Sequence, residues 1–130
     1  MQLKRFTSDD LDEMNSWYKG RNMPELPLES LPEVGFIVKG LACGFIYNME
    51  DKIGLIEGYI TPNNVNHRER DEALDLVTQS LLSAAKDLNL NKIMVLTQAQ
   101  AIYERALKFG FQNIGSFQVM SKDLSDESKV

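Results

Sequence analysis

The stretch that decides the fold is residues 53–61, IGLIEGYIT, read together with the two segments that follow it. β-branched and aromatic residues dominate these nine positions, which is typical of a strand. Residues 68–88 then repeat apolar residues at helical spacing, and residues 92–97 (KIMVLT) form another apolar run. A strand, a long helix and a second strand predict a crossover connection, and a crossover makes the two strands parallel.

Outside this unit the sequence predicts four more strands and two more helices. Short polar or glycine turns separate the strands in the first half, which favours antiparallel hairpins there. The segment of residues 21–33 holds three of the four prolines and is expected to be irregular. The expected fold class is therefore α/β (α+β), with a mixed, mostly antiparallel sheet. The further strands are residues 3–6, 34–39, 42–48 and 111–121, and the further helices are residues 8–19 and 99–109. Thr7, followed three residues later by Asp10, predicts a capping box at the start of the first helix.

Length and charge restrict the class of protein. A chain of 130 residues predicts a single domain, here residues 1–122, followed by a polar tail, residues 123–130. The 14 basic and 19 acidic residues leave a net charge of −5. Nucleic acids and anionic membranes require clusters of Lys and Arg, so neither is expected as a partner.

Cysteine and histidine usage argues against a metal site. Cys43 is the only cysteine and lies in an apolar run, so we expect a buried thiol and no intrachain disulfide. His67 is the only histidine, and with Cys43 far from it no zinc site or nucleophilic triad is predicted. The first ten residues lack a secretory signal, and no run reaches the roughly 18 apolar residues of a membrane span. A cytoplasmic location is expected.

Residues 54–122 resemble the GNAT superfamily of N-acetyltransferases. The matching pieces are the strand LIEGYITP (residues 55–62), the long helix, the strand IMVLT (residues 93–97), and a helix ending in LKFGF (residues 107–111). The resemblance implies that the two parallel strands splay apart, with helices on both faces of the sheet. It also implies that acetyl-CoA binds in the gap, its pantetheine along residues 59–61 and its pyrophosphate at the start of the long helix.

The phosphate-binding motif of the superfamily is matched only in part. That motif places Arg or Gln three residues before a glycine and five before a glycine or alanine, and here Asp71 replaces the first glycine. Its carboxylate could cap the helix N–H groups that should receive phosphate, and it adds negative charge. Alternatively, residues 66–72 are simply a charged helix start. The implied cofactor contacts are Tyr59, Ile60, Thr61, Arg68, Glu69, Arg70, Asp71, Glu72 and Ala73.

The catalytic tyrosine of many superfamily members would fall at Ala106, four residues before Gly110. Tyr103 lies about one helical turn earlier and is the candidate acid that protonates the leaving thiolate. The alternative is that Tyr103 is a packing residue with its hydroxyl at the surface.

Glu57 is the candidate general base, because a carboxylate between Ile56 and Gly58 in a central strand should have a raised pKa. Tyr59, two positions further along, is expected on the same strand face. The alternative for Glu57 is a solvated sheet edge. Trp17 and Tyr18 would border the acceptor site in a GNAT fold, or else form a hydrophobic lid on the core.

Two functions follow from these observations. The first is an N-acetyltransferase that uses acetyl-CoA as co-substrate, needs no metal, and acetylates a small-molecule or protein amine. The alternative is a GNAT-like binding or regulatory domain that has lost cofactor binding, which Asp71 and Ala106 favour. The resemblance also implies a homodimer.

Overall fold

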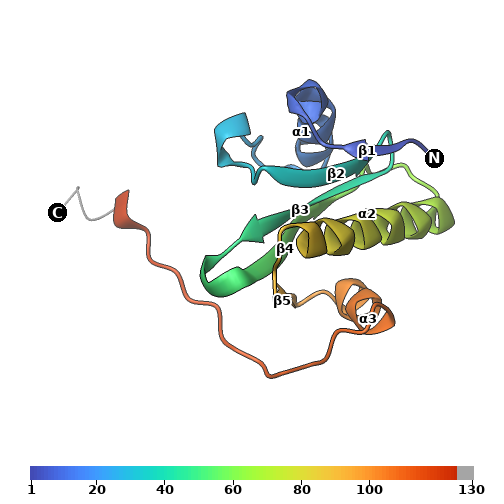
Figure 1. Cartoon of the computed structure of the whole chain (residues 1–130). Helices are drawn as coiled ribbons and strands as arrows, with labels where there is room; N and C mark the ends of the chain where they lie inside the picture. The colour runs from blue at the N-terminus through green and yellow to red at the C-terminus, as the bar shows by residue number, and fades with distance from the viewer. Residues whose placement is uncertain (126–130) are drawn as a thin grey trace.

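The computed structural model describes residues 1–125, which form five strands and three α-helices (Figure 1). The order and boundaries agree closely with the predicted elements up to the last helix, and residues 126–130 of the predicted tail lie outside the described part. The elements are β1 Leu3–Arg5, α1 Leu11–Gly20, β2 Val34–Val38, β3 Ala42–Asn48, β4 Ile53–Ile60, α2 His67–Asp87, β5 Lys92–Val95 and α3 Gln100–Lys108.

The sheet follows the chain order β1-β2-β3-β4-β5. The first four strands are antiparallel neighbours, and β4 and β5 are parallel, as the crossover through α2 requires. The turn from β2 to β3 contains Gly40 at φ +76°, a conformation that glycine adopts without steric cost. The predicted mixed sheet with one parallel pair is confirmed.

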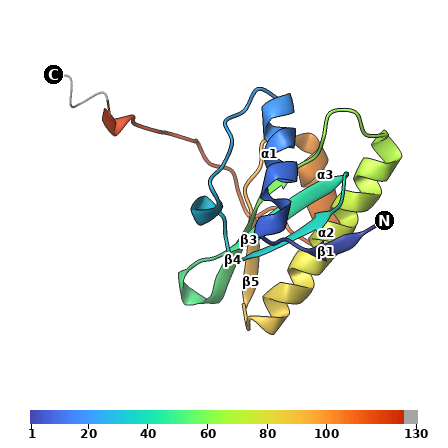
Figure 2. The ribbon, with the colours of Figure 1, turned by 90° about the horizontal axis from the view of Figure 1, so that it is seen from above.

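Helices cover both faces of this sheet, as Figures 1 and 2 show. On one face α2 buries an apolar stripe against β2, β3 and β4, with Val77 and Leu81 fully enclosed. On the other face α1 packs Met14, Trp17 and Tyr18 against the sheet. Two apolar layers thus enclose the sheet, which is the arrangement that buries both of its faces.

A buried carboxylate joins α1 to the sheet. Asp10 is 1% exposed and accepts a hydrogen bond from the backbone N–H of Thr7 at 2.9 Å, which confirms the predicted capping box. It also pairs with Lys4 and, at 3.0 Å, with Lys39. Burial raises the pKa of this carboxyl, but Lys4, Thr7 and Lys39 outweigh burial and lower the pKa to about 2.

Two predictions about the C-terminal part are wrong. The strand predicted for residues 111–121 is absent: that segment is extended, lies outside the sheet, and is exposed over residues 112–121. The strand predicted for residues 92–97 ends at Val95. Strand-forming residues alone do not make a strand, because its hydrogen bonds need a partner, and no strand of residues 1–125 pairs with this segment.

Candidate functional site

The two parallel strands separate halfway along β4. Their pairing runs from Ile53 opposite Lys92 to Ile56 opposite Val95, and there it ends. β4 continues to Ile60, whereas the chain after Val95 turns away toward α3. Beyond Ile56, therefore, no strand in the described part of the chain pairs with the β5 side of β4, which confirms the splayed parallel pair.

A β-bulge at Gly58 lies at the point of separation. Cys43 and Phe45 are two residues apart on β3, whereas their partners on β4, Ile60 and Glu57, are three residues apart. The extra residue is accommodated at Gly58, whose φ of +74° is unfavourable for residues with a side chain. A Cβ on Gly58 would also lie 3.0 Å from the Phe45 ring.

The bulge reverses the in-and-out alternation of β4 and separates Glu57 from Tyr59. Tyr59 packs on the α2 face, where its hydroxyl lies 2.6 Å from the Thr78 hydroxyl. Ile60 belongs to the core on the α1 face. Glu57 lies close enough to Tyr18, on that α1 face, to add to the rise that burial causes in the pKa of the Tyr18 hydroxyl. The predicted shared face of Glu57 and Tyr59 is wrong.

Glu57 is exposed, so the apolar surroundings expected around its carboxyl are missing. Its position at the bulge explains the difference, because the other side chains of β4 are buried or half-buried, whereas at the bulge the parallel strands separate and water reaches the side chain. Tyr59 is the residue that burial affects: desolvation raises the pKa of its hydroxyl.

The end of β4 is held by a residue that sequence reasoning missed. Arg21 donates from Nε to the Thr61 carbonyl oxygen and from Nη2 to the Thr61 hydroxyl, both at 2.9 Å. Thr61 is itself buried. Forty residues separate the pair along the chain, and no local pattern marks an arginine in the irregular segment as its partner.

The start of α2 is capped by Asn66, which sequence reasoning also missed. The Asn66 side-chain oxygen accepts hydrogen bonds from the backbone N–H groups of Arg68 at 2.8 Å and Glu69 at 3.4 Å. The expectation that Asp71 caps these donors is wrong, because Asp71 lies more than a turn into the helix. An asparagine directly before a helix is a strong capping signal and could have been recognised.

Asp71 instead joins α2 to α3. Its carboxylate lies 3.1 Å from Arg105 Nη2 and 3.4 Å from His67 Nε2. Arg105 Nε also lies 3.0 Å from Asp75, one turn further along α2, and Lys108 pairs with the same carboxylate. The Arg105 side chain is only 10% exposed. The negative charge of Asp71, which was expected to oppose phosphate binding, is thus paired with the positive charge of Arg105 from α3.

The other residues of the expected phosphate motif occupy the first two turns of α2. Arg68, Glu69 and Glu72 are exposed, and Arg68 pairs with Glu72 at 3.5 Å. Arg70 contacts His67. Ala73 is fully buried against the sheet, so its side chain points toward the core, and its assignment as a cofactor contact stays a prediction.

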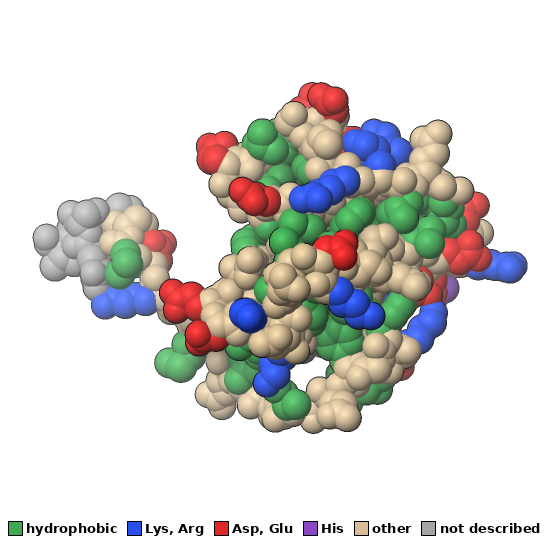
Figure 3. Space-filling model, in the orientation of Figure 1, with side chains coloured by type: hydrophobic (Ala, Val, Ile, Leu, Met, Phe, Trp, Pro, Cys, Tyr) green, Lys and Arg blue, Asp and Glu red, His purple; other side chains and the backbone are tan. Residues whose placement is uncertain are grey.

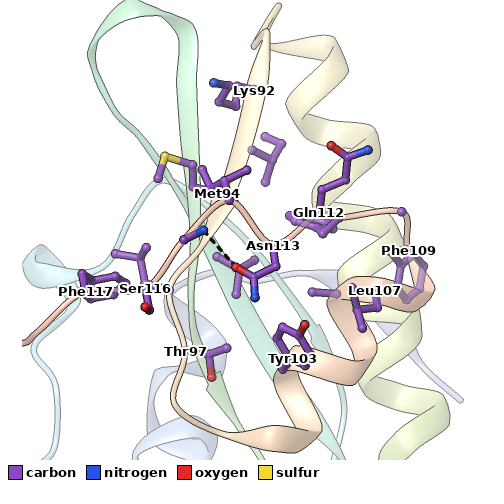
Figure 4. Close-up of a pocket in the computed structure, with 18 of the residues that line it drawn as sticks. Lys92, Met94, Thr97, Tyr103, Leu107, Phe109, Gln112, Asn113, Ser116 and Phe117 are labelled. Carbon is purple, nitrogen blue, oxygen red and sulfur yellow. Dashed lines mark hydrogen bonds between the residues drawn. The ribbon is translucent and has the colours of Figure 1, made fainter.

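Two cavities adjoin α3. A small one, about 10 Å³, lies where β4 and β5 separate and is lined by Tyr59, Arg105 and Ala106 among others. A larger one, about 840 Å³, lies on the outer side of β5 and is lined by Tyr103 and residues 109–117 (Figure 4). Tyr103 lines only the larger cavity, whereas Ala106 lines both.

Trp17 and Tyr18 are buried in the α1-face core, with Leu26 and Leu31 of the irregular segment packed against that core. The surroundings of Trp17 are thus those of a core packing residue, which agrees with the alternative of a hydrophobic lid on the core. Cys43 is buried as predicted, and burial raises the pKa of its thiol. Within residues 1–125 there is no group of three or more His, Cys, Asp or Glu side chains that could hold a metal ion. Nor does any helix in that range have the length and apolar character needed to cross a membrane.

Neither a protein-family model nor a curated protein sequence matches this sequence. Solved structures do match. Rv2747 from Mycobacterium tuberculosis, in complex with CoA, aligns with a TM-score of 0.71 at 16% identity over 100% of this chain and 82% of its own. Aminoglycoside N-acetyltransferase AAC(6')-Iy, also in complex with CoA, aligns with a TM-score of 0.68 at 12% identity over 94% of this chain and 99% of its own.

A transcriptional regulator from Bacillus halodurans aligns comparably, with a TM-score of 0.67 at 14% identity over 93% of this chain and 99% of its own. Similarity at this level concerns the course of the backbone, and one fold can serve several functions. The mixed sheet, its splayed parallel pair and these alignments together show that the chain has the GNAT fold.

Proposed function

We propose that the protein is an N-acetyltransferase that transfers the acetyl group of acetyl-CoA to an amine, either a small molecule or a protein side chain. The observation that carries this proposal is the β4 backbone between Glu57 and Ile60, which pairs with β3 on one side and has no described strand partner on the other, where β5 turns away. Such a backbone can pair with an extended amide-containing chain as it would with a strand, and the pantetheine of acetyl-CoA is such a chain.

Acetyl-CoA, when bound, supplies an acetyl thioester. The attacking amine forms the amide bond, the carbon–sulfur bond breaks, and the amine loses a proton while the thiolate gains one. Glu57 is the carboxylate on the separated part of β4 and is our candidate for accepting the amine proton, directly or through water. Tyr103 or solvent would protonate the thiolate, and Tyr18 would border the acceptor beside Glu57.

The α2 start fits the pyrophosphate less well, because Asn66 already occupies two of the helix N–H donors. Arg68 and Arg70 supply positive charge at that end of the helix and would carry the interaction instead. The occupied donors, and the ion pairs that hold α3 against α2, favour the second candidate function, a GNAT-like binding or regulatory domain without cofactor.

Thermal unfolding with and without acetyl-CoA tests the cofactor. At about 100 times its dissociation constant the ligand should raise the free energy of unfolding by roughly 2.7 kcal/mol. Pantetheine should stabilise the protein less, since it lacks the phosphates that Arg68 and Arg70 would contact. If acetyl-CoA at millimolar concentration leaves the melting temperature unchanged, the enzyme proposal is wrong and the cofactor-free domain is favoured.

Glu57→Gln tests the base, using release of free thiol from acetyl-CoA in the presence of a panel of amines. The substitution retains shape and removes basicity, so turnover should fall by roughly 10²–10⁴-fold with acetyl-CoA binding nearly intact. The rising limb of the pH–rate profile should also disappear. Glu50→Gln, which changes an exposed carboxylate in the turn before β4, is the matched control and should retain both features. An unchanged profile in Glu57→Gln would assign the proton to another group.

A further inference from the structure

The small cavity where β4 and β5 separate, at about 10 Å³, has room for one water-sized group. Three of the described residues that line it are polar, namely Tyr59, Thr78 and Arg105. Its other lining side chains are apolar and come from β4, β5, α3 and the segment after α3. A polar atom that enters this cavity from the gap between the strands therefore meets two hydroxyls and one guanidinium as its hydrogen-bond partners.

The two hydroxyls form a hydrogen-bonded chain with a defined direction. Thr78 Oγ1 donates to the Leu74 carbonyl oxygen at 2.8 Å, and the Tyr59 hydroxyl oxygen lies 2.6 Å from Thr78 Oγ1. Because a hydroxyl has a single proton to donate, Thr78 accepts in the second hydrogen bond and Tyr59 donates. Thr78 is 3% exposed, so its oxygen has a fixed position and holds the Tyr59 hydroxyl at the cavity wall.

Two charged groups act on the Tyr59 hydroxyl, Arg105 from α3 and Asp75 from α2. Burial raises the pKa of this hydroxyl, whereas Thr78 and Arg105 act in the opposite direction. The net change is upward, so Tyr59 is protonated at neutral pH and has a proton to give. Arg105 lines the same cavity, and its positive charge favours the phenolate that loss of the proton would leave.

The bulge at Gly58 places this hydroxyl on the opposite side of the sheet from Glu57. Tyr59 packs on the α2 face, whereas Glu57 lies toward Tyr18 on the α1 face. An amine that attacks a thioester loses a proton while the departing sulfur gains one, and each transfer needs its own group. With Glu57 as the base on the α1 face, the α2 face is the side that has to supply a proton.

The length of α2 suits the arm of acetyl-CoA that joins its phosphates to its sulfur. Figure 3 shows acidic and basic side chains at the right-hand edge of the molecule, where α2 starts. Thr78 lies ten residues after Arg68, which is about 15 Å along the helix axis. The pantetheine arm is as long as four residues of extended chain, roughly 14 Å. Phosphates held at Arg68 would thus bring the sulfur level with Thr78.

We propose that Tyr59 is the acid of the reaction, that it protonates the sulfur of the departing CoA, and that Thr78 positions it. The inference rests on the proposed acetyltransferase function and assigns to Tyr59 the role otherwise left to Tyr103 or solvent. The electron pair of the broken carbon–sulfur bond goes to sulfur, which takes the proton as the Tyr59 O–H bond breaks. The Thr78 hydroxyl turns from Leu74 to donate to the phenolate, and solvent returns the proton after CoA leaves. Tyr103 lines only the outer cavity.

Binding of CoA and of desulfo-CoA, which lacks the sulfur, tests the contact without turnover. At pH 9 much of a free thiol is ionised, so the wild type should prefer CoA. Tyr59→Phe removes only the hydroxyl and should reduce this preference by about tenfold, since a hydrogen bond to a charged group is lost. Tyr47→Phe, which changes an exposed tyrosine on β3, is the matched control and should retain the preference. An undiminished preference in Tyr59→Phe would overturn the proposal.

Turnover separates the acid from the residue that positions it. Tyr59→Phe should lower kcat by roughly 10²-fold and leave the rising limb of the pH–rate profile, which is assigned to Glu57, in place. Thr78→Val should lower kcat by a smaller factor, and Thr78→Ser, which restores a hydroxyl, should recover the wild-type rate. If Tyr103→Phe rather than Tyr59→Phe loses turnover and the preference for CoA, Tyr103 is the donor and the proposal is wrong.

Failure of this inference and failure of the acetyltransferase proposal give different results. A wild type that binds neither CoA nor desulfo-CoA refutes both. A protein that binds CoA and acetylates amines equally well with and without the Tyr59 hydroxyl is an acetyltransferase with a different acid. Thermal unfolding checks that each variant folds. If Tyr59→Phe does not fold, the comparison of Thr78→Val with Thr78→Ser decides, and equal rates in these two variants would contradict the proposal.

Discussion

The two helices beside the parallel strands are attached in different ways. α2 buries six residues, including Ala73, Val77 and Leu81, against the sheet. α3 buries none, although its apolar side chains Ile102 and Ala106 approach the region where β4 and β5 separate. The N-terminal region, here residues 1–87, therefore carries most of the apolar core. The C-terminal region, from α3 onward, packs against the outside of that core.

The ion pairs of the two regions also differ in how much apolar packing surrounds them. Asp10, between Lys4 and Lys39, lies next to the apolar core under α1. Arg105, between Asp71 and Asp75, is the main described connection from α3 to α2. The ion pairs of Asp10 add to the apolar contacts of the core beside them. The ion pairs of Arg105, in contrast, hold a helix that has no buried residues and so few apolar contacts of its own. One wall of the candidate site is thus firmly built, and the other can open at low cost.

The largest expected difference concerns core leucines. Leu81→Ala removes a fully buried side chain of α2 and should lower the free energy of unfolding by about 3 kcal/mol. Leu107→Ala, on α3 and 48% exposed, should change it by less than about 0.5 kcal/mol. Urea denaturation of both variants measures the two effects. Equal losses would mean that α3 is as much part of the core as α2.

Acid should weaken the N-terminal region through Asp10. Its folded pKa of about 2 is below the ordinary value of 3.8, so its contribution of about 2 kcal/mol is complete above pH 4. That contribution is lost as pH falls from about 4 to 2. Denaturation of the wild type and Asp10→Asn between pH 2 and 6 measures it: the two stabilities should differ most above pH 4 and converge toward pH 2. A constant difference across this range would contradict the assignment.

Gly58 and Gly110 both have positive φ, so replacing each with alanine compares the packing around β4 with the packing after α3. Gly58→Ala should cost between about 1 and 2 kcal/mol, because the left-handed conformation is unfavourable for alanine and the new Cβ meets the Phe45 ring at 3.0 Å. Gly110→Ala, at φ +89° with nothing within 4 Å of the Cβ, should cost about 1 kcal/mol. Thermal denaturation compares them. A larger loss of stability in Gly110→Ala than in Gly58→Ala would mean that the chain is packed more tightly after α3 than at the β4 bulge, which would contradict our description.

A modest effect on stability, concentrated in α3, is expected at Arg105. Arg105→Gln removes the charge that joins α3 to α2 and should cost about 1 kcal/mol, since its partners are partly exposed. Amide hydrogen exchange should accelerate in α3 and remain unchanged in α2. Arg68→Gln, which breaks the exposed pair with Glu72, is the control and should alter neither. Unchanged exchange in α3 would mean that apolar contacts hold the helix.

Much of the fold could be predicted from the sequence because the evidence was local. Apolar periodicity identified β4 and α2, short turns predicted the hairpins, and the crossover required a parallel pair. The capping box at Thr7 and Asp10 spans three residues and was recognised for the same reason. The resemblance added the expectation that the parallel strands splay, which the end of pairing at Ile56 confirms.

The sequence by itself determined the order of elements and the sheet that they form, since periodicity and turns act over a few residues. Only the tertiary structure decided the details of the site. The bulge at Gly58, which turns Glu57 and Tyr59 to opposite faces, depends on the register with β3. The pairing of Asp71 with Arg105 spans 34 residues, and the last segment lacks a strand partner. Contacts of this kind exist only after the chain has closed, so no local pattern records them.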